Sequence, residues 1–425
     1  MSPHDSRLAN GLGLSVEPLP GHGGGLVSVA LTVAAGGDAD PAGRHGTAHL
    51  VEHLMFPRAA ATETDDGLDS HVARVEGAGG VCNAETHRDH TVFHTTVPAE
   101  LLPEVLEWEA RRLLTFAPDG SVLRTETSVI AEEIRGAAAA GRVWEAALGA
   151  LYPGSRDSFG TPGELARATA AEAGAFFRRH YRPDAMVLSV VGDVDPDRVA
   201  ASVDSHFGQL PAGEGPLPAP SPAPSPAPAP AVAPAVVRTA PLASPVSGAA
   251  LGHPLPDPVR DRAAYLAHVV LAETLSRSRL PGLTRRDPRI TSARVTCGYL
   301  GQWLGSAVPD LALAQFATAP GADVTAVLGA WREVLAELAA RPADAAEHRR
   351  AVNALLLACH RRADSLTARS VSLGRTALLF PGAGGPDALP RDLARVTAAE
   401  VSAAAAALLA GPCSVTALGE IGETR

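Results

Sequence analysis

Apolar residues fill most positions of a short segment that begins after Thr47, namely Ala48, Leu50, Val51, Leu54 and Met55. Thr47 is a residue type that caps helix N-termini, and Pro57 is one that ends helices. The pattern therefore predicts a short, largely buried helix. Its polar members are two histidines and a glutamate, and their burial is unfavourable unless they are paired or bind a metal.

A second helical pattern runs from residue 122 to residue 137. At about 100° per residue, one face of this helix collects Val122, Glu126, Val129, Ile130, Glu133 and Ala137. Glu132 and Arg135 point away from that face. Because a carboxylate on a buried face needs a cation or strong donors, Glu126 and Glu133 are candidate site residues. The alternative is a pair of acids bonded to arginines.

Alternating residues after Gly79 and Gly80 predict a β-strand, with Val81, Asn83, Glu85 and His87 on one face and Cys82, Ala84 and Thr86 on the other. An edge strand can bind an extended peptide through main-chain hydrogen bonds, and a small residue such as Ala84 lets another backbone approach. An ordinary turn residue is the alternative interpretation of Asn83. His87, His90 and His94 share no consistent spacing, so we expect surface or core histidines there.

A Pro/Ala/Ser-rich segment at residues 211–235 divides the chain near its middle. Such a composition favours an extended linker, so we predict domains at 1–210 and 236–425. Both domains end with an apolar strand followed by glycine and an acid, at 186–193 and 414–420. This similarity indicates a duplicated unit.

Composition and charge argue against several kinds of partner and site. A net charge of −10 argues against nucleic acid or an anionic membrane as a partner. The four cysteines are far apart and show no CxxC spacing, so neither a disulfide framework nor a cysteine zinc site is expected. The N-terminus lacks an apolar signal region, and no apolar window approaches 18 residues. We therefore expect a cytoplasmic protein.

His49, Glu52 and His53 carry the candidate chemistry. Positions i and i+4 share one helix face, so both imidazoles can reach a single metal ion, and Glu52 lies close enough to address a water on that metal. Two histidines and a carboxylate with an open position are typical of hydrolytic zinc sites. The order His-x-x-Glu-His is the inverzincin motif. The alternative is a surface helix with two solvated histidines. Periodicity selects Glu133 over Glu132 as the third ligand, with Glu126 orienting the site.

The chain resembles the pitrilysin/insulinase family of zinc peptidases, in the shorter branch that includes the mitochondrial processing peptidase. The matching segments are residues 46–56, 79–93, 126–134, 181–184 and 190–194. The resemblance implies an α+β fold of two homologous domains, each an antiparallel-rich sheet covered by helices, that together form half of a clam shell. It also implies Zn²⁺ on His49, His53 and Glu133, with Glu52 as general base.

The same resemblance assigns further residues. It implies that Glu126 is the supporting acid of the catalytic site and that Asn83 and Ala84 bind the substrate backbone. In active relatives the second domain adds an arginine and, seven residues later, a tyrosine that bind the substrate carbonyl. Here the matching arginines are Arg285 and Arg286, but Ser292 and Ala293 stand where the tyrosine would be.

We therefore expect a zinc metalloendopeptidase that cleaves peptides or a precursor or leader peptide. The missing tyrosine favours a heterodimer in which a paralogous subunit supplies the arginine–tyrosine pair, with a homodimer as the alternative. A rival interpretation is a weakly active or non-catalytic subunit that binds peptides or acts as a scaffold.

Overall fold

The structure is a computed structural model that describes residues 3–21, 24–55, 71–139, 142–217, 236–385 and 387–419. Pro57, Phe56 and most of the predicted 211–235 linker lie outside these ranges. The chain forms two compact units. Unit 1 comprises Met1–Ile134, Arg156–Ser221 and Arg361–Pro386, and unit 2 comprises Arg135–Ser155, Pro222–His360 and Asp387–Arg425.

Unit 1 is built on a six-stranded sheet in which β2 and β6 are parallel and the other neighbours are antiparallel. In spatial order its strands are β1 (His4–Arg7), β2 (Gly13–Pro18), β6 (Met186–Gly192), β3 (Leu26–Val33), β5 (Thr91–Pro98) and β4 (Val81–Thr86). Strand β4 stands at the edge. The predicted single strand at 81–87 is thus the first arm of a β4–β5 hairpin.

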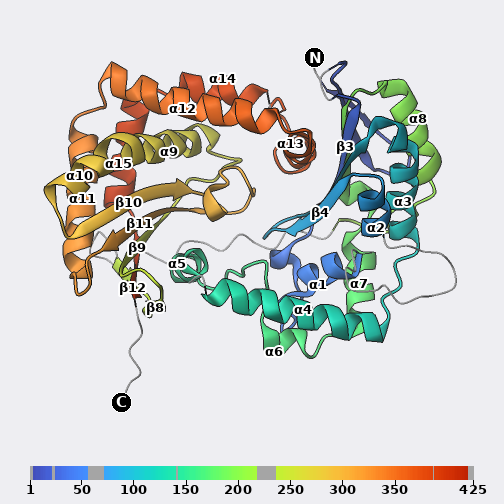
Figure 1. Ribbon diagram of the computed structural model, residues 1–425, viewed down its shortest axis with the longest axis horizontal. Helices are drawn as coiled ribbons and strands as arrows, with labels where there is room; N and C mark the ends of the chain where they lie inside the picture. The colour runs from blue at the N-terminus through green and yellow to red at the C-terminus, as the bar shows by residue number, and fades with distance from the viewer. Residues whose placement is uncertain are drawn as a thin grey trace. The chain divides into compact units, whose positions relative to one another are not determined.

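Most helices of unit 1 lie on one side of this sheet and contribute to its main apolar core (Figure 1). They are α1 (Thr47–Met55), α2 (His71–Gly77), α3 (Leu102–Leu114), α4 (Gly120–Ala139, which continues into unit 2), α6 (Pro162–Leu165), α7 (Ala170–His180) and α8 (Pro196–Phe207). The predicted helices at 47–55 and 122–137 correspond to α1 and α4. Leu50, Val51 and Ile130 are fully buried in this core, which anchors both helices.

Unit 2 repeats the arrangement. Its sheet contains, in spatial order, β10 (Ile290–Cys297), β11 (Leu311–Thr318), β9 (Gly248–Pro254), β12 (Cys413–Gly419) and β7 (Val236–Arg238), with β8 (Leu242–Ala243) also paired to β12. Its helices are α5 (Val143–Leu151), α9 (Arg262–Thr274), α10 (Leu280–Arg286), α11 (Val324–Ala340), α12 (Ala345–Ala363), α14 (Ala388–Arg395) and α15 (Ala398–Ala410), with a π-helix at Leu275–Arg279 between α9 and α10.

The two sheets share one topology. The path β2-β6-β3-β5-β4 in unit 1 matches β7-β12-β9-β11-β10 in unit 2, and in both only the first pair is parallel. The two similar segments near 186–193 and 414–420 form β6 and β12, which occupy equivalent places. The expected fold of two homologous α/β domains is confirmed.

The compact units differ from the predicted domains 1–210 and 236–425, because each half of the chain gives one helix to the other unit. Helix α13 (Leu366–Leu379) packs beside β3 and β6 of unit 1, on the face opposite α1 (Figure 1). Its contacts are polar: Ser370 bonds Ser28 at 2.8 Å, and Arg369 pairs with buried Glu17.

In unit 2 the equivalent sheet face is covered by α5, from the first half of the chain. Trp144, Ala147, Leu148 and Tyr152 of this segment pack against Ala250, Leu311 and Leu313. Hydrophobic burial therefore holds α5, whereas hydrogen bonds and an ion pair hold α13. Neither exchange follows from composition along the chain, which is why the linker alone did not predict the units.

Within the described residues, no single helix has the length and apolarity of a membrane span. Only α14 and α15 taken together meet that description, and they are bent by 83° relative to each other.

Candidate metal centre

Three predicted ligands converge in unit 1. Glu133 Oε2, from α4, lies 3.5 Å from His49 Nε2 and 3.5 Å from His53 Nε2, both from α1. One ligand atom from each of the three residues lies within 4.8 Å of the others. Two imidazole nitrogens and a carboxylate oxygen at this spacing fit a zinc ion with an open coordination position. Among the residues that the structure describes, this is the one such group of His, Cys, Asp and Glu.

Hydrogen bonds behind each imidazole aim its Nε2 atom at Glu133. His53 Nδ1 donates to Glu126 Oε2 at 2.9 Å, and His49 Nδ1 lies 3.3 Å from the carbonyl oxygen of Phe159. Glu126 is only 1% exposed and comes from the turn of α4 before Ile130. A carboxylate or carbonyl on Nδ1 sets the tautomer that leaves Nε2 free to bind a metal. Glu126 therefore supports His53 from the side of the ring opposite Nε2.

The pKa values of the two histidines differ because their surroundings differ. Burial lowers the pKa of His49. Burial also acts to lower the pKa of His53, but the Glu126 and Glu133 carboxylates outweigh it and raise that pKa to about 9. An environment that stabilises a proton on His53 also stabilises a divalent cation at the same nitrogen. The donor set therefore suits a cation in charge as well as in geometry.

Glu52 is buried on α1 beside the two histidines, with 9% of its surface exposed. Its Oε2 atom accepts a hydrogen bond from Thr86 Oγ1 of β4 at 2.5 Å. The Glu52 charge also acts on Tyr181, because burial and this charge raise the pKa of the Tyr181 phenol. Glu52 is thus a carboxylate held beside the predicted metal position without being one of the three converging ligands.

The N-terminus of α1 is capped by Asp40, which corrects the prediction of Thr47 as the cap. Asp40 accepts hydrogen bonds from Gly46 N at 2.6 Å and Ala48 N at 2.7 Å, whereas Thr47 Oγ1 donates to the Arg44 carbonyl. Burial raises the pKa of the Asp40 carboxyl to about 6, although both backbone hydrogen bonds act to lower it. A capping side chain from outside the helix cannot be found by local pattern.

A turn at residues 157–160 positions the carbonyl that holds His49. Asp157 Oδ1 accepts from Phe159 N at 2.8 Å and from Gly160 N at 3.1 Å, which fixes the turn. Gly160 has φ +91°, and a Cβ there would lie 2.4 Å from the Cα of Gly46. This turn can approach the start of α1 only because both residues are glycine.

Glu133 lies at the margin of the buried face of α4, contrary to the predicted burial. Its side chain is 43% exposed, and Val129 is also exposed at 37%. The buried stripe is instead formed by Leu123, Glu126, Ile130 and Ile134. Periodicity distinguished Glu133 from Glu132, but it misplaced the centre of the stripe by about one residue. The candidate ligand Glu133 is therefore in contact with solvent.

The predicted peptide-binding residues lie on edge strand β4. Asn83 is exposed and pairs across the hairpin with His94, whereas Ala84 is half-buried and pairs with Phe93. In the described part of the chain β4 has a strand neighbour on one side only. Within these residues β4 is therefore an edge strand of the sheet.

The histidines of the hairpin do not join the metal group. His87 and His90 are buried and stack with ring centroids 4.3 Å apart. Burial lowers the pKa of His90 to about 4, so this ring is neutral. His94 is half-buried on β5. Their interpretation as surface or core histidines agrees with this placement.

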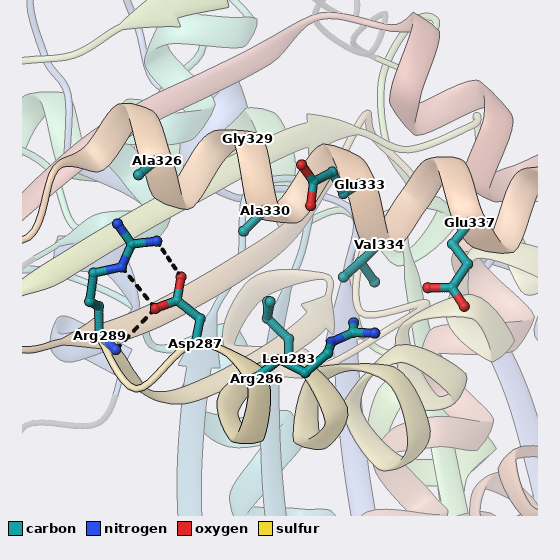
Figure 2. Close-up of a pocket in the computed structure, with 10 residues that line it drawn as sticks. All are labelled: Leu283, Arg286, Asp287, Arg289, Ala326, Gly329, Ala330, Glu333, Val334 and Glu337. Carbon is teal, nitrogen blue, oxygen red and sulfur yellow. Dashed lines mark hydrogen bonds and ion pairs between the residues drawn. The ribbon is translucent and has the colours of Figure 1, made fainter.

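Arg285 and Arg286 end α10 in unit 2. Arg286 lines a pocket of about 610 Å³ between α10 and α11, together with Glu333 and Glu337 (Figure 2). Figure 2 also shows the ion pair of Asp287 and Arg289, with 2.7 Å between Oδ2 and Nη2, at one end of this pocket.

No tyrosine stands seven residues after Arg285 or Arg286. Ser292 and Ala293 occupy those positions on β10. Tyr299 follows the strand, and its ring packs against Trp144 with centroids 4.9 Å apart.

Sequence reasoning missed three residues that hold the site together, namely Asp40, Thr86 and Phe159. Thr86 had a signal, because it alternates with Asn83 and so lies on the core face of β4. The pair Asp157 and Gly160 is also typical of a turn fixed by an aspartate side chain. Phe159 had no signal, because its contribution is a main-chain carbonyl.

Comparisons with known proteins agree with this fold. Residues 22–140 match the family described as Insulinase (Peptidase family M16), and residues 167–355 match the Peptidase M16 inactive domain. A protein named as an uncharacterized zinc protease of Mycobacterium tuberculosis is 30% identical over 224 residues, which is 51% of this chain and 50% of that protein. The mitochondrial-processing peptidase subunit beta of Saccharomyces cerevisiae is 27% identical over 221 residues, or 50% of this chain and 46% of that subunit.

The aligned part of this chain thus spans about half the length of these curated relatives. Among solved structures, a protease from Helicobacter pylori shares the fold with a TM-score of 0.83 at 18% identity, over 99% of this chain and 100% of that one. A putative M16-like peptidase from Alicyclobacillus acidocaldarius has a TM-score of 0.78 at 17% identity, over 98% of both chains. Two family matches in chain order, the shared two-domain fold and these relatives together show that the chain belongs to the insulinase (peptidase M16) family.

Proposed function

We propose that this protein is a zinc-dependent metalloendopeptidase that cleaves peptides, either in general or as a dedicated precursor or leader peptide. The observation that carries the proposal is the convergence of His49, His53 and Glu133 within 4.8 Å, with the Glu52 carboxylate beside them. The names of relatives as zinc proteases support a peptidase at the level of the family.

His49, His53 and Glu133 would hold the zinc ion. When bound, zinc polarises water and a substrate carbonyl and so makes water acidic enough to be deprotonated near neutral pH. Glu52 is the general base, which takes the proton of the attacking water and returns it to the leaving amine. Glu126 keeps His53 in the required tautomer.

Strand β4 would bind the substrate as an additional strand. Its outer edge offers main-chain donors and acceptors, and such pairing recognises an extended backbone with little dependence on sequence. Asn83 lies on the exposed face, where its amide can bond a peptide group of the substrate. Ala84 is small enough to let the peptide backbone approach the strand.

Two substitutions test the proposal. Glu52→Gln removes the base but none of the ligands, so zinc content should stay the same while peptide hydrolysis falls by roughly 10²–10⁴-fold. His49→Ala removes a ligand, so zinc itself should be lost. Metal analysis and a fluorogenic peptide library measure both effects. A Glu52→Gln protein that hydrolyses peptides at the original rate would show that Glu52 is not the base.

We also propose that the active assembly is a heterodimer with a paralogous subunit. The absence of tyrosine after Arg285 and Arg286 supports this, since an oxyanion donor contributes a few kcal/mol to transition-state stabilisation. The relative from Saccharomyces cerevisiae is itself named a subunit. Size-exclusion chromatography with light scattering, combined with activity assays, tests the idea. Full activity of the isolated chain, as a monomer or homodimer, would contradict it.

A peptide-binding or scaffold subunit without catalysis is the second candidate function. The same missing tyrosine favours it, whereas the complete ligand set opposes it. Zinc content of the purified chain separates the two, because a scaffold requires no metal. We further propose a cytoplasmic location, because the four cysteines are far apart in the sequence and show no CxxC spacing, and cell fractionation tests this.

A further inference from the structure

Thr86 connects the edge strand to the proposed base. Its hydroxyl Oγ1 lies 2.5 Å from Glu52 Oε2. No other hydrogen bond to the Glu52 carboxylate is found among the residues that the structure describes. The orientation of this carboxylate about its last side-chain bond is therefore set from outside α1 by one hydroxyl.

The surrounding hydroxyls determine which atom receives the Thr86 proton. Thr91 Oγ1 lies 3.5 Å from Thr86 Oγ1, but it donates its own proton to the Ala35 carbonyl at 2.8 Å. An ionised carboxylate can only accept. The Thr86 hydroxyl has a single proton, and Glu52 is by far the closer and more strongly accepting partner, so Thr86 donates to Glu52.

The alternation of side chains along β4 places the Thr86–Glu52 hydrogen bond close to the residues proposed to bind a peptide. Alternate residues of β4 face opposite sides of the sheet, so Ala84 and Thr86 face α1 while Asn83 and Glu85 face away. Thr86 pairs with Thr91 on β5, and this pairing fixes its position along the strand. The same strand therefore carries the residues proposed to bind a peptide and, two residues beyond Ala84, a hydroxyl that bonds the base.

We propose that Thr86 is a positioning residue that aligns Glu52 with a peptide bound on β4. The inference rests on the proposed peptidase function. One strand then holds both the peptide and the hydroxyl that orients the base. A movement of β4 therefore carries the peptide and this hydroxyl together. A group that holds a base in place acts on the rate of the chemical step more than on substrate binding.

Thr86→Val keeps the shape and removes the donor, whereas Thr86→Ser keeps the donor. In the active assembly, Thr86→Val should lower kcat by roughly ten- to a hundredfold with little change in KM or zinc content. Thr86→Ser should restore most of kcat. Thr96→Val is the matched control, since Thr96 bonds Ser28 and Thr367 on the other face of the sheet, and it should leave kcat unchanged.

A double variant separates positioning from a general structural role. If Thr86 acts only through Glu52, Thr86→Val added to Glu52→Gln should cause no further loss of residual activity. An unchanged kcat in Thr86→Val, or a Thr86→Ser variant as impaired as Thr86→Val, would overturn the proposal. So would an additive loss in the double variant.

Failure of the proposed function is recognised separately. If the zinc-loaded full chain hydrolyses no peptide in any assembly, the peptidase proposal fails. Crystal structures of zinc-loaded wild type and Thr86→Val then decide the role of Thr86. We expect the Glu52 carboxylate to bond Thr86 in the wild type and to rotate away in the variant. A carboxylate with the same orientation in both would overturn the inference.

Discussion

Replacing Glu126 by glutamine perturbs the metal centre without touching a ligand. Glu126 is buried at 1% exposure and accepts a hydrogen bond from His53 Nδ1 at 2.9 Å. Glutamine has nearly the same volume and keeps one acceptor oxygen. The substitution therefore removes only the negative charge behind the imidazole.

The magnitude follows from the type of hydrogen bond. A bond to a charged group contributes about 1.5–3 kcal/mol, whereas a neutral one contributes about 0.5–1.5 kcal/mol. The difference of about 1–1.5 kcal/mol corresponds to roughly five- to thirteenfold in a dissociation constant. Loss of a carboxylate partner of a metal-binding histidine typically weakens the metal site by about 10–100-fold. We therefore expect zinc to bind roughly tenfold more weakly.

Competition with a chromophoric chelator at constant pH measures the zinc dissociation constant directly. Glu132→Gln is the matched control, because it makes the same change on the exposed side of the same helix and should leave zinc affinity unchanged. If Glu126→Gln binds zinc as tightly as the wild type, the charge of Glu126 does not tune His53. The reasoning from hydrogen-bond geometry would then be refuted.

Three further predictions concern the turn, the exchanged helix and buried histidine. Gly160 has φ +91° and no room for a Cβ, so Gly160→Ala should lower the free energy of unfolding by about 1–2 kcal/mol and weaken zinc binding in the chelator titration. Gly163 has open space around it, so Gly163→Ala should change neither quantity. Arg369→Leu leaves buried Glu17 unpaired and should lower the free energy of unfolding, measured in urea, by about 3–5 kcal/mol. Replacing both residues by leucine should largely reverse this loss. An unchanged urea midpoint in Arg369→Leu would contradict a stabilising role of the ion pair. Burial lowers the pKa of His253 to about 4, below its ordinary 6.5, so protonation of this ring favours the unfolded chain. The free energy of unfolding should therefore fall by up to about 1.4 kcal/mol per pH unit as the pH drops from about 6.5 toward 4. Urea unfolding at several pH values should show that the free energy of unfolding depends less steeply on pH in His253→Gln. The same pH dependence in both proteins would refute the contribution of His253.

Part of the candidate site was predictable because two of its three candidate ligands are neighbours on one helix. His49 and His53 are one helical turn apart, so their convergence needs no knowledge of the fold. Glu133 was distinguished from Glu132 by helical period alone. The β4 strand was predictable from alternation, and the duplicated domains from two similar strand ends. The first three of these inferences depend on periodicities within one helix or strand, and the last depends on comparing two segments of the chain.

Other features depend on which segments meet in space. Asp40 caps α1 from a preceding loop, and Phe159 supports His49 from 110 residues away through a carbonyl that every residue has. The exposure of Glu133 reflects where α4 meets the core. No local pattern carries this information.

Helices α5 and α13, which each join the unit formed mainly by the other half of the chain, were also not predictable from local sequence. Ser370 and Arg369 make α13 complementary to polar residues on one sheet face, and Trp144 makes α5 complementary to the apolar face of the other. The amino-acid sequence by itself predicted the helix that carries His49 and His53, Glu133 as the candidate third ligand, and a duplicated unit, from helical periodicity and from the similarity of two strand ends. Only the tertiary structure decided what orients those ligands and which unit each helix joins, because hydrogen bonding and burial between distant segments depend on the folded chain.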